Sequence, residues 1–139
     1  YGVCYKSSYG WGPWSKKLGQ CYLDEALKIS QKAKNGELPY LNSLGLNDMM
    51  SGKPRVLDLD NVGRTNVTDP AVKKPCAFVL AEQWFADYNN DDNTWLTSED
   101  SGFAWLRSEE GLKTLASIHV NALKKYIKMR QGHSETKDV

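Results

Sequence analysis

The stretch that decides the fold is SEEGLKTLASIHVNALKKYIKMRQ, residues 108–131. Its apolar side chains recur every three or four residues, which is the period of an amphipathic α-helix. Ser108 is a suitable N-cap, and the two glutamates after it suit a first helical turn. We expect residues 132–139 to fray beyond the helix. One face of this helix carries Leu112, Leu115, Ala116, His119, Val120, Leu123, Tyr126 and Ile127, and the opposite side carries Lys113, Lys124 and Lys128.

A second helix is predicted over about residues 15–35. Ser15 can cap its start, and Gly36 is typical of the position just after a helix, where left-handed backbone is common. The apolar positions again follow helical spacing and predict one buried face. They are Leu18, Tyr22, Ala26, Ile29 and Ala33.

A third helix is predicted over about residues 75–88. Pro75 suits the first position of a helix, because its missing N–H would have no partner there. The apolar stripe that follows is wide and predicts a largely buried helix. It comprises Ala77, Leu80, Ala81, Trp84, Phe85 and Tyr88.

The remaining chain predicts long irregular connections. Glycines and prolines leave room for a turn or two of helix around residues 46–50. Residues 56–60, VLDLD, alternate apolar and polar side chains, so a short strand or a small β-hairpin is expected near residues 55–60. The fold class predicted is therefore mainly α, with three principal amphipathic helices and short extra helices in a single domain over residues 1–139.

The charge balance and hydropathy of the chain exclude some classes of partner. There are 18 basic and 17 acidic side chains, a net charge of +1, so no global field draws the chain to nucleic acid or to an anionic membrane. The longest apolar run, residues 77–81, is far below the roughly 18 residues that span a bilayer. We therefore expect neither a nucleic-acid partner nor a membrane span.

Three cysteines, Cys4, Cys21 and Cys76, allow one disulfide in any of three pairings. On helical wheels Cys21 and Cys76 lie outside the apolar faces of their predicted helices. A cysteine with a purely structural role would be expected on the buried face. We interpret this as one disulfide among the three and predict an exported protein, secreted or periplasmic. Free thiols are the alternative.

One catalytic hypothesis is a cysteine-dependent amidase or peptidase. Cys21 falls near the start of a predicted helix, where the helix dipole favours a thiolate. His119 is the histidine available within the predicted fold, although a histidine in an apolar stripe is usually hydrogen-bonded at a helix interface. A glycoside hydrolase built on Glu82 lacks a partner acid that can be named. No catalytic set is favoured.

Metal and cofactor sites are also not favoured. Asp58, Asp60 and Asp69 occupy positions 1, 3 and 12 of an EF-hand-like window with Gly63 at position 6, but position 5 lacks an oxygen ligand. This is a partial match to a calcium loop, and a solvated turn is preferred. Neither HExxH nor paired CxxC is present, so zinc is disfavoured and no cofactor is predicted.

Two aromatic loops suit protein binding. Residues 1–14 combine tyrosine, tryptophan and glycine with little charge, a composition typical of binding surfaces. The acidic stretch near Trp95 suits a basic partner surface. We therefore predict a small binding protein, an inhibitor or immunity-type protein that neutralises an enzyme by loop insertion; a homodimer through the last helix is a related option. The proposed contacts are Tyr9, Trp11, Trp14, Asp91, Asp92 and Trp95.

Overall fold

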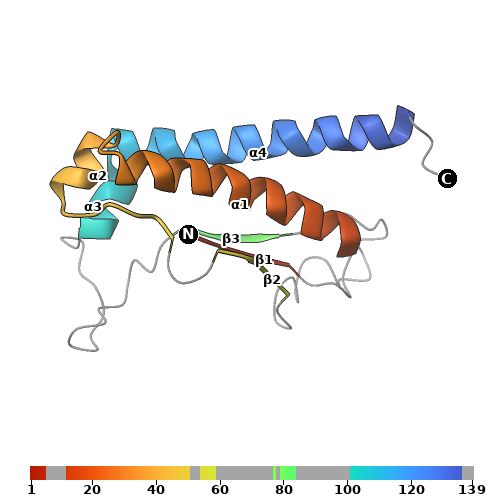
Figure 1. Ribbon diagram of the computed structural model, residues 1–139, viewed down its shortest axis with the longest axis horizontal. Coiled ribbons are helices and arrows are strands. Elements are labelled where there is room, and N and C mark those ends of the chain that lie inside the picture. Colours follow the sequence, from red (N-terminus) through yellow and green to blue (C-terminus); the bar gives the residue numbers. More distant parts are fainter. Residues whose placement is uncertain (6–11, 51–53, 59–76, 78, 84–100, 136–139) are drawn as a thin grey trace.

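The protein is mainly helical and carries a small three-stranded sheet (Figure 1). The structure is a computed structural model that describes residues 1–5, 12–50, 54–58, 77, 79–83 and 101–135. This confirms the mainly α fold class. In chain order the elements are β1 (Gly2–Tyr5), α1 (Gly12–Lys34), α2 (Pro39–Ser43), β2 (Val56–Asp58), β3 (Leu80–Glu82), α3 (Ser101–Arg107) and α4 (Glu109–Glu135).

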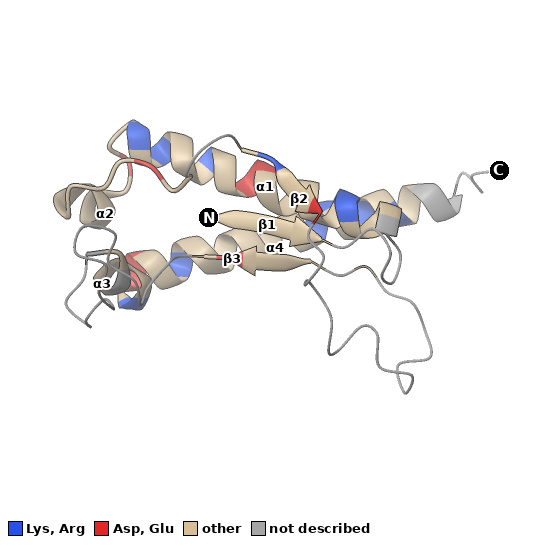
Figure 2. Cartoon of the chain, turned by 90° about the horizontal axis from the view of Figure 1, so that it is seen from below, with Lys and Arg blue, Asp and Glu red and all other residues tan. Residues whose placement is uncertain are grey.

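The two long helices, α1 and α4, run antiparallel and cover one face of the sheet (Figures 1 and 2). The strand order is β2-β1-β3, with β1 parallel to β2 and antiparallel to β3. Helix α1 approaches the sheet closely at Gly19, where a Cβ atom would lie 2.8 Å from Cγ1 of Val56. A larger residue would push the helix off the sheet, so this glycine serves close packing.

The core lies between α1, α4 and β1. Cys21, Ala26 and Ala33 of α1 are almost fully buried, as are Ile118 and Ala122 of α4. Apolar burial of this kind is the main source of stability in a small domain. None of the described helices combines the length and hydropathy needed to cross a lipid bilayer.

Helix α1 ends as predicted but begins earlier. It starts at Gly12, so Ser15 is not its N-cap but a fully buried residue within the helix. At the other end Gly36 has φ of +75° and donates to the carbonyl of Ala33, while Glu37 donates to that of Lys32. These two bonds form a Schellman motif, and the left-handed backbone it needs favours glycine.

The predicted helix over residues 75–88 is wrong where the structure describes it. Residues 80–82 form β3, whose Ala81 pairs with Val3 of β1. A short apolar run is compatible with either a buried helix or a strand, and here the free edge of β1 supplies backbone partners that a helix would leave unpaired. Residues 84–88 lie outside the described residues.

Two shorter predictions also need correction. Residues 56–58 do form a strand, but it pairs in parallel with β1 and so is not half of a local hairpin. The short helix lies at Pro39–Ser43, and residues 46–50 are not helical. Pro39 takes the first helical position, where its missing N–H costs nothing.

Glu110 ties the ends of three helices together. Its carboxylate accepts hydrogen bonds from the backbone N–H groups of Tyr40 and Leu41, at 3.0 and 2.8 Å, and so caps the first turn of α2. It also accepts the indole N–H of Trp105, which is completely buried, at 3.0 Å. The two backbone partners, Tyr40 and Leu41, are 70 and 69 residues away along the chain, too far for a sequence pattern to reveal.

The junction between α3 and α4 is equally tight. Ser108 caps α4 as predicted, since its hydroxyl accepts the N–H of Gly111 at 2.9 Å. A Cβ atom on Gly111 would lie 1.8 Å from the backbone oxygen of Trp105. Glycine is therefore required at the start of α4 because the two helices meet there backbone to backbone.

Candidate interaction surface

Helix α4 has two apolar sides, and the described part of the chain covers one of them. Leu115, Ile118 and Ala122 are buried. The other side is exposed to solvent, with exposed fractions of 59% for Leu112, 48% for Val120, 42% for Leu123 and 53% for Ile127, and Ala116 is also exposed. We call these five residues (Leu112, Ala116, Val120, Leu123 and Ile127) the outer stripe.

The outer stripe revises the single face predicted from the sequence. Of the eight residues on that face, Leu115 is buried, His119 and Tyr126 are half-buried, and the other five make up the outer stripe. Helical periodicity groups side chains by direction but does not say which part of a wide face another element covers. Here the part that includes Leu115 joins the buried core, and the elements that contact α4 are chiefly α1 and then α3 and α2.

The stripe is straight and continuous. Its members are spaced by four, four, three and four residues, which keeps them within a narrow arc of an undistorted helix. At 1.5 Å per residue it is roughly 22 Å long. Single exposed apolar side chains are ordinary on a protein surface, but a contiguous row of this length marks an interaction site.

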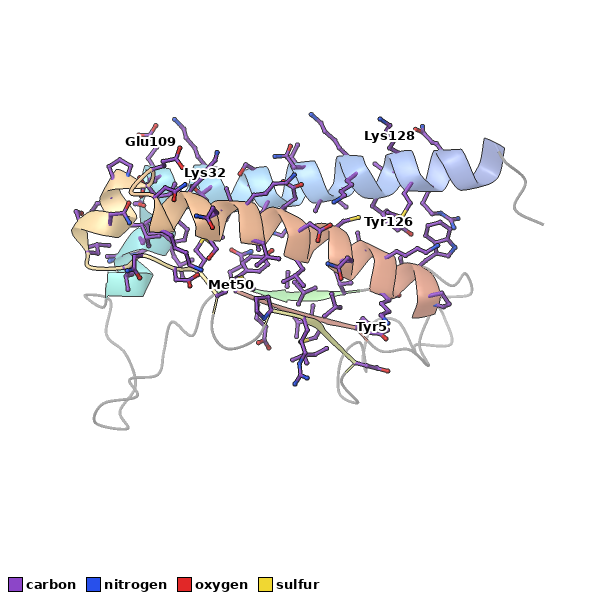
Figure 3. All side chains as sticks on the ribbon, viewed as in Figure 1. Tyr5, Lys32, Met50, Glu109, Tyr126 and Lys128 are labelled. Carbon is purple, nitrogen blue, oxygen red and sulfur yellow. The ribbon has the colours of Figure 1, made fainter. Side chains whose placement is uncertain are left out.

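A row of lysines follows one edge of the stripe. Lys113, Lys124 and Lys128 each directly follow a stripe residue, so they lie about 100° around the helix in the same direction. Figure 3 shows Lys128 pointing away from α1 and Tyr126 pointing towards it. We call these three residues the lysine row. The opposite edge of the stripe borders the part of α4 that joins the buried core.

The lysine row is weakly compensated. Lys113 pairs with Glu109 at 2.6 Å, but both side chains are largely exposed, so the pair contributes little. Lys124 and Lys128 make no ion pair with the part of the chain that the structure describes. Residues 112–132 contain five basic and no acidic side chains, although the whole chain has a net charge of only +1.

Trp14, predicted as a binding anchor in an N-terminal arm, lies in the first turn of α1. Its ring meets Tyr126 edge-on with centroids 6.0 Å apart. The cationic groups of Lys17 and Arg130 lie 4.3 and 4.2 Å from its centroid. Trp14 therefore joins the start of α1 to the end of α4 and is half-buried there.

The other predicted binding residues, Tyr9, Trp11, Trp95, Asp91 and Asp92, lie outside the described residues.

His119 joins three elements through hydrogen bonds. Its Nδ1 lies 2.9 Å from the hydroxyl of Tyr22 in α1, and its Nε2 lies 3.1 Å from the amide nitrogen of Gln83, which follows β3. With the amide donating to Nε2, a neutral ring carries its proton on Nδ1 and donates it to the Tyr22 oxygen. Burial raises the pKa of Tyr22, which keeps that hydroxyl neutral. This is the arrangement of a histidine that stabilises a helix interface.

Cys21 does not have the position that the catalytic hypothesis needs. It lies nine residues after Gly12, where α1 begins, so the helix N-terminus does not activate it. It is 1% exposed rather than on a polar face, and burial raises the pKa of its thiol, which disfavours the thiolate. Both ring nitrogens of His119 have other partners. The predictions that Cys21 lies near the start of its helix and on the polar side of that helix are therefore wrong.

The structure holds no bridge at the described cysteines. Cys4 and Cys21 are both free thiols, and any pairing among the three cysteines would use at least one of them. Both are buried, Cys4 in β1 and Cys21 in α1. A buried free cysteine packs as a small apolar side chain, so these two positions can be explained without a disulfide. Cys76 lies outside the described residues.

The calcium window is not assembled in the described part of the chain. Asp58 is exposed at the end of β2, and Asp60 and Asp69 lie outside the described residues. Among the described residues, no group of three or more His, Cys, Asp or Glu side chains is placed to hold a metal ion.

Compared with known families, curated proteins and solved structures, the chain matches no family model, no curated protein and no solved structure. The surface on α4 therefore has to be interpreted from its own chemistry. The sequence suggested self-association through the wide face of this helix, but it did not show which residues of that face are exposed. The available signal was an apolar face wider than one packing seam needs, bordered by lysines.

Proposed function

We propose that this chain is a small protein-binding domain that takes a helix of a partner protein on the outer stripe of α4. The observation that carries the proposal is the row of five exposed apolar residues beside an edge that carries three lysines and no acidic residue. An exposed apolar row of this kind promotes aggregation unless a partner covers it, which favours a binding role.

The shape of the stripe supports a helical partner. Leu112, Ala116 and Val120 form one ridge of i, i+4 positions, and Leu123 and Ile127 continue a second. Such ridges pack into the grooves of another helix. The small side chain of Ala116 leaves a depression between larger neighbours, where a side chain of the partner can insert. The outer stripe is convex and linear, which suits helix-on-helix packing rather than a small-molecule pocket.

The chemistry of the stripe argues against other partners. Its members are aliphatic, so they offer no ring on which a nucleic-acid base can stack. Interfacial membrane helices typically carry tryptophan and phenylalanine as well as leucine on the apolar side, and the stripe has no tryptophan or phenylalanine. The half-exposed row is also narrow, which fits a single packed helix.

Part of the earlier hypothesis is kept and part is not. The class of function, protein binding without catalysis, is kept. Inhibition of an enzyme by inserting Trp11 and Trp95 stays a prediction from the sequence, since both lie outside the described residues. Export likewise stays a prediction from the sequence, and the free thiols of Cys4 and Cys21 add no support to it.

The test compares two apolar sites of similar exposure. In the double variant Val120→Glu plus Ile127→Glu, charges interrupt the outer stripe. The control is Leu27→Glu on α1, where the leucine is 37% exposed and away from α4's stripe. Proteins cross-linked to wild type in its native source are identified, purified and titrated against all three forms. We expect the affinity of the partner to fall at least tenfold in the double variant and to be unchanged in the control.

Three results would contradict the proposal. Equal affinity for the double variant and the wild type would exclude the stripe as the binding surface. Equal loss in the Leu27→Glu control would indicate a general effect of added charge. A concentration-dependent dimer in sedimentation experiments that the double variant abolishes would assign the stripe to a second copy of the chain.

A further inference from the structure

We infer that the helix bound on the outer stripe is acidic, with aspartate or glutamate side chains on one edge of its apolar face that pair with the lysine row of α4. This inference rests on the proposed function and names the chemistry of the partner. The inference rests on the position of the lysine row beside the outer stripe. Lys113, Lys124 and Lys128 directly follow Leu112, Leu123 and Ile127 in the sequence.

The positions of the lysines match a helix lying along the stripe. A partner helix packed on the stripe has its edges within reach of long side chains on the flanking positions of α4. Lysine stems can lie along the apolar seam while the ammonium groups meet charges at its rim. The geometry resembles the e and g positions of coiled coils, where opposite charges set the choice of partner.

The local charge is one-sided, which favours an anionic edge on the partner. Residues 112–132 hold five basic and no acidic side chains. Two of them, Lys125 and Arg130, already have partners: Lys125 binds Asp24 of α1 at 2.6 Å, and Arg130 lies over Trp14. Lys124 and Lys128 have no such partner within the described residues, and Lys113 has only an exposed glutamate. The available charge therefore concentrates along the stripe.

A second copy of this chain is a poorer occupant. In a twofold pair with antiparallel α4 helices, the same edge of each helix meets the same edge of the other, so the lysine row of one copy would lie beside that of the next. Like charges in such contact cost binding energy and suppress that pairing. An acidic partner replaces this repulsion with attraction and raises the rate of association.

The experiment uses two designed amphipathic helical peptides with the same leucine row. One has glutamates along both edges of the row and the other has lysines there. Each is titrated into isotope-labelled full-length protein, and chemical shifts report the affinity and the residues involved. We expect the acidic peptide to bind at least tenfold more tightly, with shifts along the outer stripe and the lysine row, and the difference to shrink as salt is raised.

Charge reversal supplies the matched variant. Lys124 and Lys128 are exposed, so Lys124→Glu plus Lys128→Glu leaves the core untouched. We expect this variant to prefer the basic peptide. Lys16→Glu plus Lys32→Glu on α1 is the control for net charge, since Lys16 and Lys32 are exposed there too, and it should keep the preference for the acidic peptide.

The outcomes separate the inference from the function on which it rests. Equal binding of both peptides to the stripe would overturn the acidic partner and leave the helix-binding surface standing. No binding of either peptide, or binding that survives Val120→Glu plus Ile127→Glu, would overturn both. Tighter binding to vesicles rich in anionic lipid than to the acidic peptide would replace the helix with a membrane surface.

Discussion

The two sides of α4 contain the same kinds of residues in two different environments. Leu115 and Ile118 are buried against the rest of the protein, whereas Leu112 and Ile127 are more than half exposed. The leucines are three residues apart and the isoleucines nine, so periodicity places the two isoleucines on opposite sides of α4, but composition does not say which side is covered. The difference teaches that burial is decided by where the neighbouring elements lie, and that an apolar residue left uncovered is available to another molecule.

The strongest way to break this comparison is the same substitution on both sides. Ile118→Ala removes buried atoms from a side chain that is 1% exposed, and we expect it to lower the free energy of unfolding by about 3 kcal/mol through lost burial and a cavity. Ile127→Ala should change it by less than about 0.5 kcal/mol. Urea denaturation of both variants measures this. Similar losses at the two positions would mean that the outer stripe is covered in solution.

Two neighbouring glutamates repeat the comparison with charged side chains. Glu110 accepts three hydrogen bonds at the junction of α2, α3 and α4. Glu110→Gln puts an amide donor where only acceptors fit and leaves a buried N–H group unpaired, which we expect to cost about 2 kcal/mol. The control is Glu109→Gln, which breaks only the exposed pair with Lys113 and should cost less than about 0.5 kcal/mol. Thermal unfolding of the two variants distinguishes them, and equal shifts in Tm would refute the role of Glu110.

The sequence was sufficient for the features that depend on neighbouring residues. The start of α4 at Ser108 and the end of α1 at Gly36 follow from side chains within a few positions of the helix end. It was insufficient where distant segments decide. The strand at residues 80–82 exists because β1 offers an open edge, and Glu110 finds its partners about 70 residues away. For the candidate site, the sequence showed the wide apolar face of α4 and the lysines beside it. It did not show which residues of that face are buried and which are exposed.

Acid sharpens the comparison, because Asp48, which lies after α2 and bonds to α1, titrates at low pH whereas the lysines beside the outer stripe do not. Burial alone would raise the pKa of Asp48, but hydrogen bonds from Ser30, from the N–H of Met50 and from Lys34 lower it to about 2 from an unfolded value of 3.8. A lowered folded pKa gives stability that is present above about 4 and is lost as the pH falls towards 2. The side chain is 36% exposed, so we expect only about 1 kcal/mol from it.

Asp48→Asn removes this titration and provides the check. Its free energy of unfolding should be lower than that of the wild type at pH 7 and should approach it near pH 2. Substitution of Lys124 by glutamine, which removes a charge on the outer side, should leave the dependence on pH over this range unchanged, because lysine stays protonated throughout it. A wild-type stability that is flat between pH 5 and pH 2 would contradict the assignment to Asp48.

The smallest effect on stability is expected at Val120, and it is the most informative about function. Val120→Thr keeps the branched shape and a similar helix propensity, and it replaces a methyl group with a hydroxyl at a position that is 48% exposed. The free energy of unfolding should change by less than about 0.5 kcal/mol, since the hydroxyl stays hydrated in the free protein. A partner helix would have to desolvate that hydroxyl, so the affinity for the acidic peptide should fall several-fold. Stability and binding therefore respond in opposite order to Ile118→Ala and Val120→Thr. If the outer stripe binds no partner, Val120→Thr should change neither the free energy of unfolding nor the affinity for the acidic peptide.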